Sequence, residues 1–178
     1  LPFVAPLLLL AVAAIFVTRP GRRPGILPRL SELAALGALA SGGAGVTHLL
    51  VAGPTNVGAG ALLLRLDAIS ATMALLVGFV GWIVMRYSRT YLDGEAREGA
   101  FHGLMLATLA GVLVLVQAGS LGLLVAAFAA IGLGLRRLLL FYPDRAEARR
   151  AATKFALVWH AGDAALVLAA VLLFAATG

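Results

Sequence analysis

The stretch KFALVWHAGDAALVLAAVLLFA, residues 154–175, decides the class of fold. Its length matches the roughly 20 residues that an α-helix needs to cross the hydrocarbon core of a bilayer. Between its two end residues, Asp163 is the one side chain with a formal charge. A run this long and this apolar predicts a transmembrane helix, because the bilayer offers no hydrogen-bonding partner to an open backbone.

Similar apolar runs fill most of the remaining chain. The expected helices cover about 1–18, 30–52, 66–85, 100–118, 120–140 and 154–175. Of the 178 residues, 62% are hydrophobic and 12% are charged, whereas soluble domains carry roughly 25% charged residues. We therefore predict an all-α, polytopic bundle of about six transmembrane helices, forming a single transmembrane domain over residues 1–178. The run from Leu1 to Val17 lacks the basic start of a signal peptide and is expected to be a retained helix.

Basic residues alternate between successive expected loops. The first, third and fifth loops carry arginine clusters, the second carries Arg65, and the fourth carries no basic residue. By the positive-inside rule, the odd loops are expected to face the cytoplasm and both ends of the chain the outside. The net charge of +6 is spread over short clusters without interleaved aromatic residues, which argues against nucleic-acid binding. The expected surroundings are therefore those of a lipid bilayer.

Ionisable side chains inside a membrane helix are costly and mark functional sites. His160 and Asp163 lie three residues apart, so they share one face of the sixth expected helix. Such a pair suits a proton or cation relay, and it equally suits a buried polar contact that fixes helix packing. Lys154 points to the opposite side of that helix, where it is expected to reach the cytoplasmic interface. Asp163, His160 and Lys154 are our candidates for an ion path.

The cytoplasmic end carries candidates for contact with a partner. Arg136 and Arg137 are adjacent, so their side chains diverge by about 100° and only one of them can easily reach the headgroups. The other needs an acidic group, backbone carbonyls or a partner subunit. Together with the fifth loop, the partner-contact candidates are Arg136, Arg137, Arg145, Arg149 and Arg150. Asp144 is expected to cap a short amphipathic turn over 145–150 at the membrane surface.

Other polar residues are expected to serve structure. His48 and His102 are expected to be hydrogen-bonding groups, Arg65 and Asp67 to pair or cap a helix, and Glu32 to favour the helix dipole. The segment 53–60 is expected to be a flexible outer loop. Without cysteines, and with three scattered histidines, the chain shows no metal-ligand or nucleophile motif. We expect no catalytic residue, no metal and no cofactor in this chain.

Several stretches resemble the antiporter-like subunits of respiratory complex I and of Mrp antiporters. They are 64–70 (LRLDAIS), 77–82 (VGFVGW), 86–88 (RYS), and Lys154-Phe155 followed by 160–163 (HAGD). The resemblance covers about Leu64 to Gly178 and implies the N-terminal part of such a subunit, which has roughly twice as many helices in two inverted repeats. The chain is expected to be either part of a longer subunit or a truncated relative.

One position departs from this family. Its ion-pumping members carry a Gly-Trp-Glu motif on the fifth helix, whereas the matching residues here are Ala127-Phe128-Ala129. Ala129 therefore stands where the family has a glutamate. A neutral side chain cannot pair with the lysine that the family places on its next helix.

Two further stretches, 86–95 and 135–144, resemble the membrane subunits of DAB inorganic-carbon accumulation complexes. This resemblance implies a bacterial inner-membrane subunit that couples a cation gradient, of protons or sodium, to one-way CO2 hydration. It also implies a DabA-like, carbonic-anhydrase-related partner on the cytoplasmic side that holds the zinc, so this chain would not be an enzyme by itself. Two alternatives stay open: an ion-translocating subunit of the complex I or Mrp type, and a membrane anchor that moves no ion.

Overall fold

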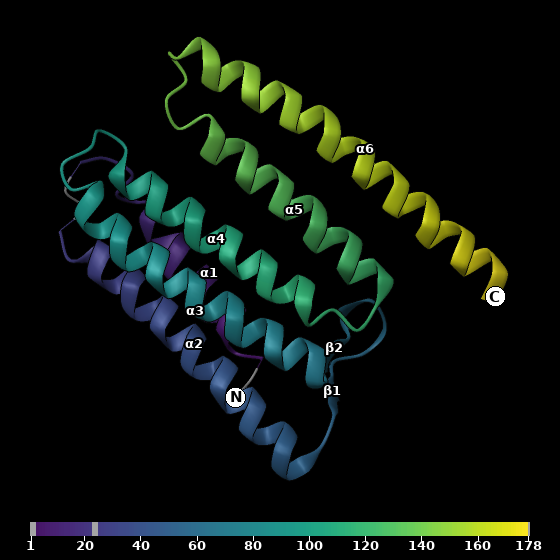
Figure 1. Ribbon diagram of the computed structural model, residues 1–178. Coiled ribbons are helices and arrows are strands. Elements are labelled where there is room, and N and C mark those ends of the chain that lie inside the picture. The colour runs from purple at the N-terminus through teal and green to yellow at the C-terminus, as the bar shows by residue number, and fades with distance from the viewer. Residues whose placement is uncertain (1–2, 23–24, 178) are drawn as a thin grey trace.

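The computed structural model describes residues 3–22 and 25–177, which form a bundle of six α-helices with a small hairpin at one end (Figure 1). The helices are α1 (Ala5–Phe16), α2 (Leu27–Ala52), α3 (Ala68–Tyr91), α4 (Glu98–Val116), α5 (Leu121–Leu139) and α6 (Ala146–Thr177). The predicted all-α class is confirmed. Leu1 and Pro2, where the first helix was expected to begin, lie outside the described residues.

Five of the described helices, α2 to α6, are long and apolar enough to cross a membrane. The 12 residues of α1 make a helix of about 18 Å, which is shorter than the hydrocarbon core of about 30 Å. Pro28 lies in the first turn of α2, where a missing N–H costs nothing. Among the six described helices, α1 is thus the one whose length does not match the thickness of the bilayer core.

Two helices extend further than the apolar pattern predicted. α3 continues past Met85 to Tyr91, and α6 begins at Ala146 and not at Lys154. The expected separate turn over 145–150 is therefore wrong. No glycine or proline interrupts residues 144–154, so the helix continues beyond the apolar boundary and carries its arginines into the interface.

The helices pack as neighbouring pairs. α2 lies along α3, α1 lies against α4, α5 follows α4, and α6 packs on α5 at the edge of the bundle (Figure 1). Glycines bring α2 and α3 close together, since a Cβ at Gly42 would lie 2.9 Å from Leu75 Cα and one at Gly78 would lie 2.9 Å from Leu39 Cα. Small residues at such a seam allow backbone packing where no hydrophobic effect drives helices together.

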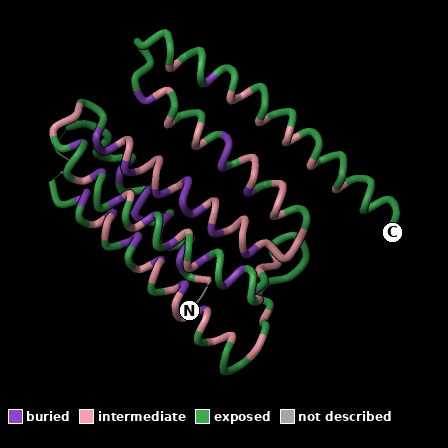
Figure 2. The backbone as a smooth tube through the Cα atoms, viewed as in Figure 1, coloured by how far each residue is buried: buried purple, intermediate pink, exposed green. Residues whose placement is uncertain are grey.

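The outside of the bundle is apolar. Ile69, Val158 and Phe174 are 74%, 70% and 75% exposed, and the outer side of α6 is exposed along nearly its whole length (Figure 2). Buried side chains gather instead between α1, α2 and α4, around Leu9 and Leu106. Apolar residues on the outside suit lipid or a further membrane-embedded protein surface, and they confirm a multi-pass membrane protein.

The second loop is a hairpin, which corrects the expected flexible loop over 53–60. β1 (Thr55–Val57) pairs antiparallel with β2 (Leu64–Leu66), and the short 3-10 helix η1 (Gly60–Leu62) lies between them. β2 is also tied to the α4–α5 connection, because the Arg65 N–H donates to Gln117 O at 2.7 Å. Both outer loops are thereby joined by backbone hydrogen bonds, a pairing too distant in sequence for local patterns to indicate.

The three arginine-rich loops meet at the opposite end of the bundle, which we call the basic end. Gly99 N–H donates to Gly21 O at 3.2 Å, and the Arg97 guanidinium donates to Phe141 O at 3.0 Å. On α3 near this end, Arg86 lies over the ring of Trp82 at 5.5 Å. Arginine beside amphipathic aromatic rings is typical of the headgroup region, and by the positive-inside rule we expect this end at the cytoplasm.

Candidate ion site on helix α6

His160 and Asp163 form a polar pair halfway along α6. His160 Nδ1 lies 3.2 Å from Asp163 Oδ2. In a neutral imidazole, this contact requires the tautomer in which Nδ1–H donates to the carboxylate and Nε2 keeps its lone pair. The side chain of His160 is 60% exposed and that of Asp163 is 23% exposed. The structure therefore brings together the two residues that helical spacing placed on one face.

The depth of Asp163 makes its carboxylate chemically unusual. If Lys154 marks the headgroup level, Asp163 lies about 14 Å further along the helix, near the middle of a core of about 30 Å. An ionised carboxylate there costs about 2.5–3.5 kcal/mol. Oδ1 of Asp163 is buried and has no hydrogen-bond partner within the described residues. This oxygen therefore has a free position for a further hydrogen-bond donor or a small cation.

The pair is held against α5 by an aromatic notch. The Trp159 ring stacks on Phe128 with centroids 4.5 Å apart, and Trp159 Nε1–H donates to Phe128 O at 3.3 Å. Gly132 makes room for the ring, because a Cβ there would lie 2.8 Å from Trp159 Cε2 and nearer still to Nε1. Trp159 is one helical turn before Asp163, so this notch sets the rotation of α6 about its axis and the direction of the carboxylate.

α5 brings no carboxylate to this site. Ala129, which the resemblance aligns with a glutamate of ion-pumping relatives, follows Phe128 and is half-buried. The sequence of α5 contains no acidic residue at all. The carboxylate in the middle of the α5–α6 pair is therefore that of Asp163.

Lys154 does not join this pair. It is exposed on α6 near the basic end, where it borders a shallow pocket with Arg149, Arg150 and Thr153. The half-turn between Lys154 and Asp163 that the helical period predicts is present, since both residues belong to the continuous helix α6. The three ion-path candidates thus divide into a mid-membrane pair and an interfacial cation.

The partner-contact candidates are exposed at the basic end. Arg136 and Arg137 lie in the last turn of α5, where a positive charge favours the helix dipole. Arg145 lies over the Tyr142 ring at 4.7 Å, and Arg149 donates to Pro143 O at 3.3 Å. Within the described ranges, none of the ion pairs involves these arginines. They form a basic surface, whose acidic or carbonyl partner stays a prediction.

Two other histidines make structural contacts. His102 is fully buried, its Nδ1 lies 3.2 Å from Ser31 Oγ, and its ring stacks on Phe16 at 5.8 Å. Ser31 O–H donates to Pro28 O at 2.7 Å, so the His102 Nδ1–H must donate to the serine oxygen. His48 Nε2 lies 3.4 Å from Thr55 Oγ1 in the outer hairpin. Both histidines therefore join neighbouring segments.

Asp67 and Glu32 have clearer roles than the sequence alone suggested. Asp67 caps α3 through a 2.8 Å bond from Ser70 N, and it also pairs with Arg65 at 3.0 Å, so both expected roles are present. The Ser70 N–H chiefly holds the pKa of Asp67 below its ordinary value. Glu32 pairs with Arg89 of α3. No local sequence pattern indicates that contact, since it joins residues on two different helices.

Within residues 3–22 and 25–177, no group of three or more His, Asp, Glu or Cys side chains comes close enough to hold a metal ion. The geometry of the α6 site is that of a single carboxylate assisted by an imidazole.

The chain is also similar to proteins of known family. Residues 61–102 match the profile of the family described as NADH-ubiquinone oxidoreductase (complex I), chain 5 N-terminus. The chain is 38% identical over 120 residues to the probable inorganic carbon transporter subunit DabB2 of Halothiobacillus neapolitanus, an alignment that covers 67% of this chain and 22% of that relative. It is 32% identical over 106 residues to the probable subunit DabB of Hydrogenovibrio crunogenus, which covers 59% and 20%. The aligned part of the chain thus spans about a fifth of the length of these relatives.

Proposed function

We propose that this chain is the cation-translocating, energy-coupling membrane subunit of a complex that accumulates inorganic carbon. The proposal starts from its homology to DabB-type inorganic carbon transporter subunits and from the match of residues 61–102 to the N-terminal segment of the complex I chain 5 family. The observation that carries this proposal is the His160–Asp163 contact halfway along the apolar helix α6. A purely structural helix facing lipid would replace both residues with apolar ones at a gain in stability.

The chemistry of the pair suits a proton or a sodium ion. A proton that binds Asp163 Oδ1 neutralises the carboxylate and weakens its hold on the His160 Nδ1–H. A sodium ion at the same oxygen offsets the charge without breaking the contact. In either case the ion lowers the cost of the buried carboxylate, and its departure toward the other side restores the charged form. His160 Nε2, which keeps a lone pair, offers a second position for a proton on the exposed side.

The basic end provides the surface for a cytoplasmic partner. Its exposed cations include Arg136, Arg137, Arg145, Arg149, Arg150 and Lys154. Complementary charge steers encounter and sets register, so this surface favours a partner with an acidic face. We infer that the partner is a DabA-like, carbonic-anhydrase-related subunit, which would hold the zinc and perform CO2 hydration. The location that follows is a bacterial inner membrane.

One observation favours a second function. Ala129 removes the carboxylate that ion-pumping relatives place on the fifth helix, so a membrane anchor that moves no ion has support of its own. An anchor would use His160 and Asp163 solely as a packing contact. A conventional complex I or Mrp-type ion subunit is less well supported, because the same alanine breaks its Glu–Lys step.

The proposal is tested by producing the native complex that contains this chain in a host lacking carbonic anhydrase. Growth in ordinary air is scored together with a short assay of labelled inorganic-carbon uptake, with and without a protonophore. Energy-coupled accumulation predicts rescue and uptake that the protonophore abolishes within the short assay. Absence of rescue, with all subunits shown to be in the membrane, would contradict the proposal.

A further inference from the structure

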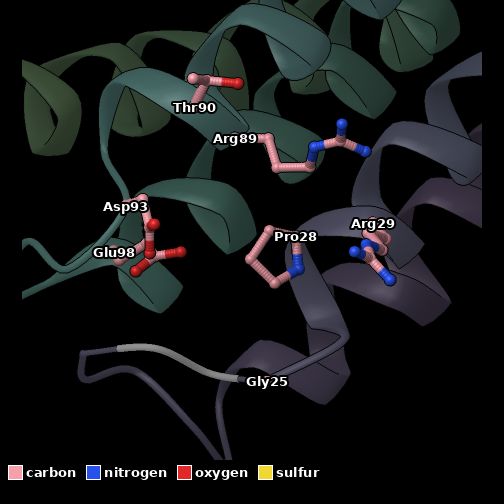
Figure 3. Close-up of a pocket in the computed structure, with 7 residues that line it drawn as sticks. All are labelled: Gly25, Pro28, Arg29, Arg89, Thr90, Asp93 and Glu98. Atoms are coloured by element: carbon pink, nitrogen blue, oxygen red, sulfur yellow. The ribbon is translucent and has the colours of Figure 1, made fainter.

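A pocket of ≈ 440 Å³ lies at the basic end, between the start of α2, the end of α3 and the start of α4 (Figure 3). Its lining is Gly25, Pro28, Arg29, Arg89, Thr90, Asp93 and Glu98. Because three membrane-length helices begin or end there, the pocket lies at the depth of the lipid headgroups. The proposed ion site is on another helix, so the function of the pocket is a separate question.

The pocket is charged on both sides with opposite signs. Figure 3 shows the side chains of Asp93 and Glu98 on one side of the pocket and those of Arg29 and Arg89 toward the other. Arg89 is held by Glu32. Glu98 is 2% exposed and accepts a 3.1 Å hydrogen bond from Gly94 N. Arg89 is thus held by an ion pair and Glu98 by burial and a hydrogen bond, so the positive and negative sides of the pocket stay apart.

One exposed basic side chain and one exposed acidic side chain border the opening of the pocket. Arg29 and Asp93 are both exposed, and none of the ion pairs in the described chain involves either of them. A ligand that carries a cation and an anion would satisfy both side chains at once. A simple anion would meet the carboxylates, and a simple cation would meet the guanidinium groups, so either would bind less well.

An apolar stripe on α2 leads away from this opening into the membrane. Leu33 and Leu36 follow Arg29 by four and seven residues, so they lie on the same face of the helix. They are 61% and 42% exposed. A phospholipid whose phosphate meets Arg29 would lay an acyl chain along these leucines, as arginine and lipid commonly share the interface.

We propose that this pocket binds the headgroup of an amine-bearing zwitterionic phospholipid of the phosphatidylethanolamine class. Arg29 receives the phosphate, and Asp93, supported by the adjacent carboxylate of Glu98, accepts N–H bonds from the primary ammonium. Phosphatidylcholine has the same net charge and no N–H to donate. Phosphatidylglycerol has the phosphate and no ammonium. The proposal does not depend on any ion movement by the chain.

Lipid competition on the unaltered protein tests the headgroup chemistry directly. The purified chain is exchanged into mixed bicelles, and the retained lipid is quantified by native mass spectrometry for phosphatidylethanolamine, phosphatidylcholine and phosphatidylglycerol with matched acyl chains. We expect phosphatidylethanolamine to be retained about two- to fivefold better than either other lipid, the range for one exposed charged contact. Equal retention of the three, or preference for phosphatidylglycerol, would overturn the proposal.

Variants locate the site. Asp93→Asn and Arg29→Gln are each expected to reduce the preference for phosphatidylethanolamine to near unity, whereas Glu95→Gln and Arg22→Gln, which change charges in the same loops outside the pocket lining, are expected to keep it. A preference unaffected by Asp93→Asn and Arg29→Gln would refute this location. Free phosphoethanolamine is added as a competitor. Displacement at concentrations equal to those of the lipid would refute the contribution of the apolar stripe.

Discussion

Filling the notch at Gly132 is expected to detach the middle of α6 from α5. In the structure, an alanine Cβ at Gly132 would lie 2.8 Å from Trp159 Cε2 and closer to two other ring atoms. Carbon atoms in contact are normally about 3.5–4.0 Å apart, so the indole must retreat by about 1 Å or more. The ring has little freedom to do so, because it stacks on Phe128 and lies 5.1 Å from Phe155.

The magnitude follows from three terms. Overpacking of a well-filled site costs about 1–3 kcal/mol. Losing the Trp159 Nε1–H bond to Phe128 O costs about 1 kcal/mol more. Alanine favours a helix over glycine by about 0.8–1.0 kcal/mol, which roughly offsets the lost hydrogen bond. Gly132→Ala is therefore expected to lower the free energy of unfolding by about 1–3 kcal/mol.

The assay uses tryptophan fluorescence during unfolding in a titration with sodium dodecyl sulfate. A Trp82→Phe background leaves Trp159 as the sole tryptophan, so its emission reports the α5–α6 contact. Gly122→Ala is the matched control on the same helix, because its nearest neighbour, the Ala61 Cβ, would be 4.0 Å away. We expect the Gly132 variant to unfold earlier with shifted Trp159 emission, and the control to be unchanged or slightly more stable. Equal unfolding of the two variants would refute the notch.

Two further substitutions test the fold. Asp67→Ala removes the cap of α3 and is expected to lower the free energy of unfolding by about 1 kcal/mol. Because the pKa of Asp67 in the folded protein lies below the ordinary value of 3.8, the stability from this carboxylate is complete above pH 3.8 and is lost as the pH falls through the folded pKa. Unfolding curves between pH 7 and pH 3 would show this loss. Gly78→Ala brings a Cβ to 2.9 Å from the Leu39 backbone. It is expected to lower the free energy of unfolding at least as much as Gly132→Ala does, because a backbone moves less easily than a side chain. Gly43→Ala, with open space around it, is the control in the same unfolding assay.

Local patterns were enough to predict the membrane helices and the polar pair on α6. Apolar runs of about 20 residues separated by arginines indicate membrane-spanning helices, because the thickness and charge of the bilayer set this pattern independently of the tertiary structure. His160 and Asp163 share a face because the helical period alone decides it. Helix ends were predicted less well, because the apolar edge near Lys154 marks the edge of the lipid core and not the start of α6 at Ala146.

Contacts between distant segments could not be predicted in this way. Strand β2 pairs with β1 and with the α4–α5 connection, and neither partner can be read from residues 64–66. The Glu32–Arg89 pair and the fit of Trp159 at Gly132 likewise join residues on two helices. A glycine in a membrane helix indicates close approach of something, and only the tertiary structure identifies what approaches.

The central claim is that Asp163 binds the ion that couples the membrane to carbon accumulation. Asp163→Asn keeps the shape of the side chain and removes its charge, and Glu147→Gln makes the same chemical change at an exposed residue in the first turn of α6. Both variants are made in the native complex, assembly is checked, and energy-dependent uptake of labelled inorganic carbon is measured. We predict that Asp163→Asn abolishes uptake in a fully assembled complex while Glu147→Gln retains it. Uptake by Asp163→Asn at the level of the unaltered complex would contradict the ion site and favour an anchor that moves no ion.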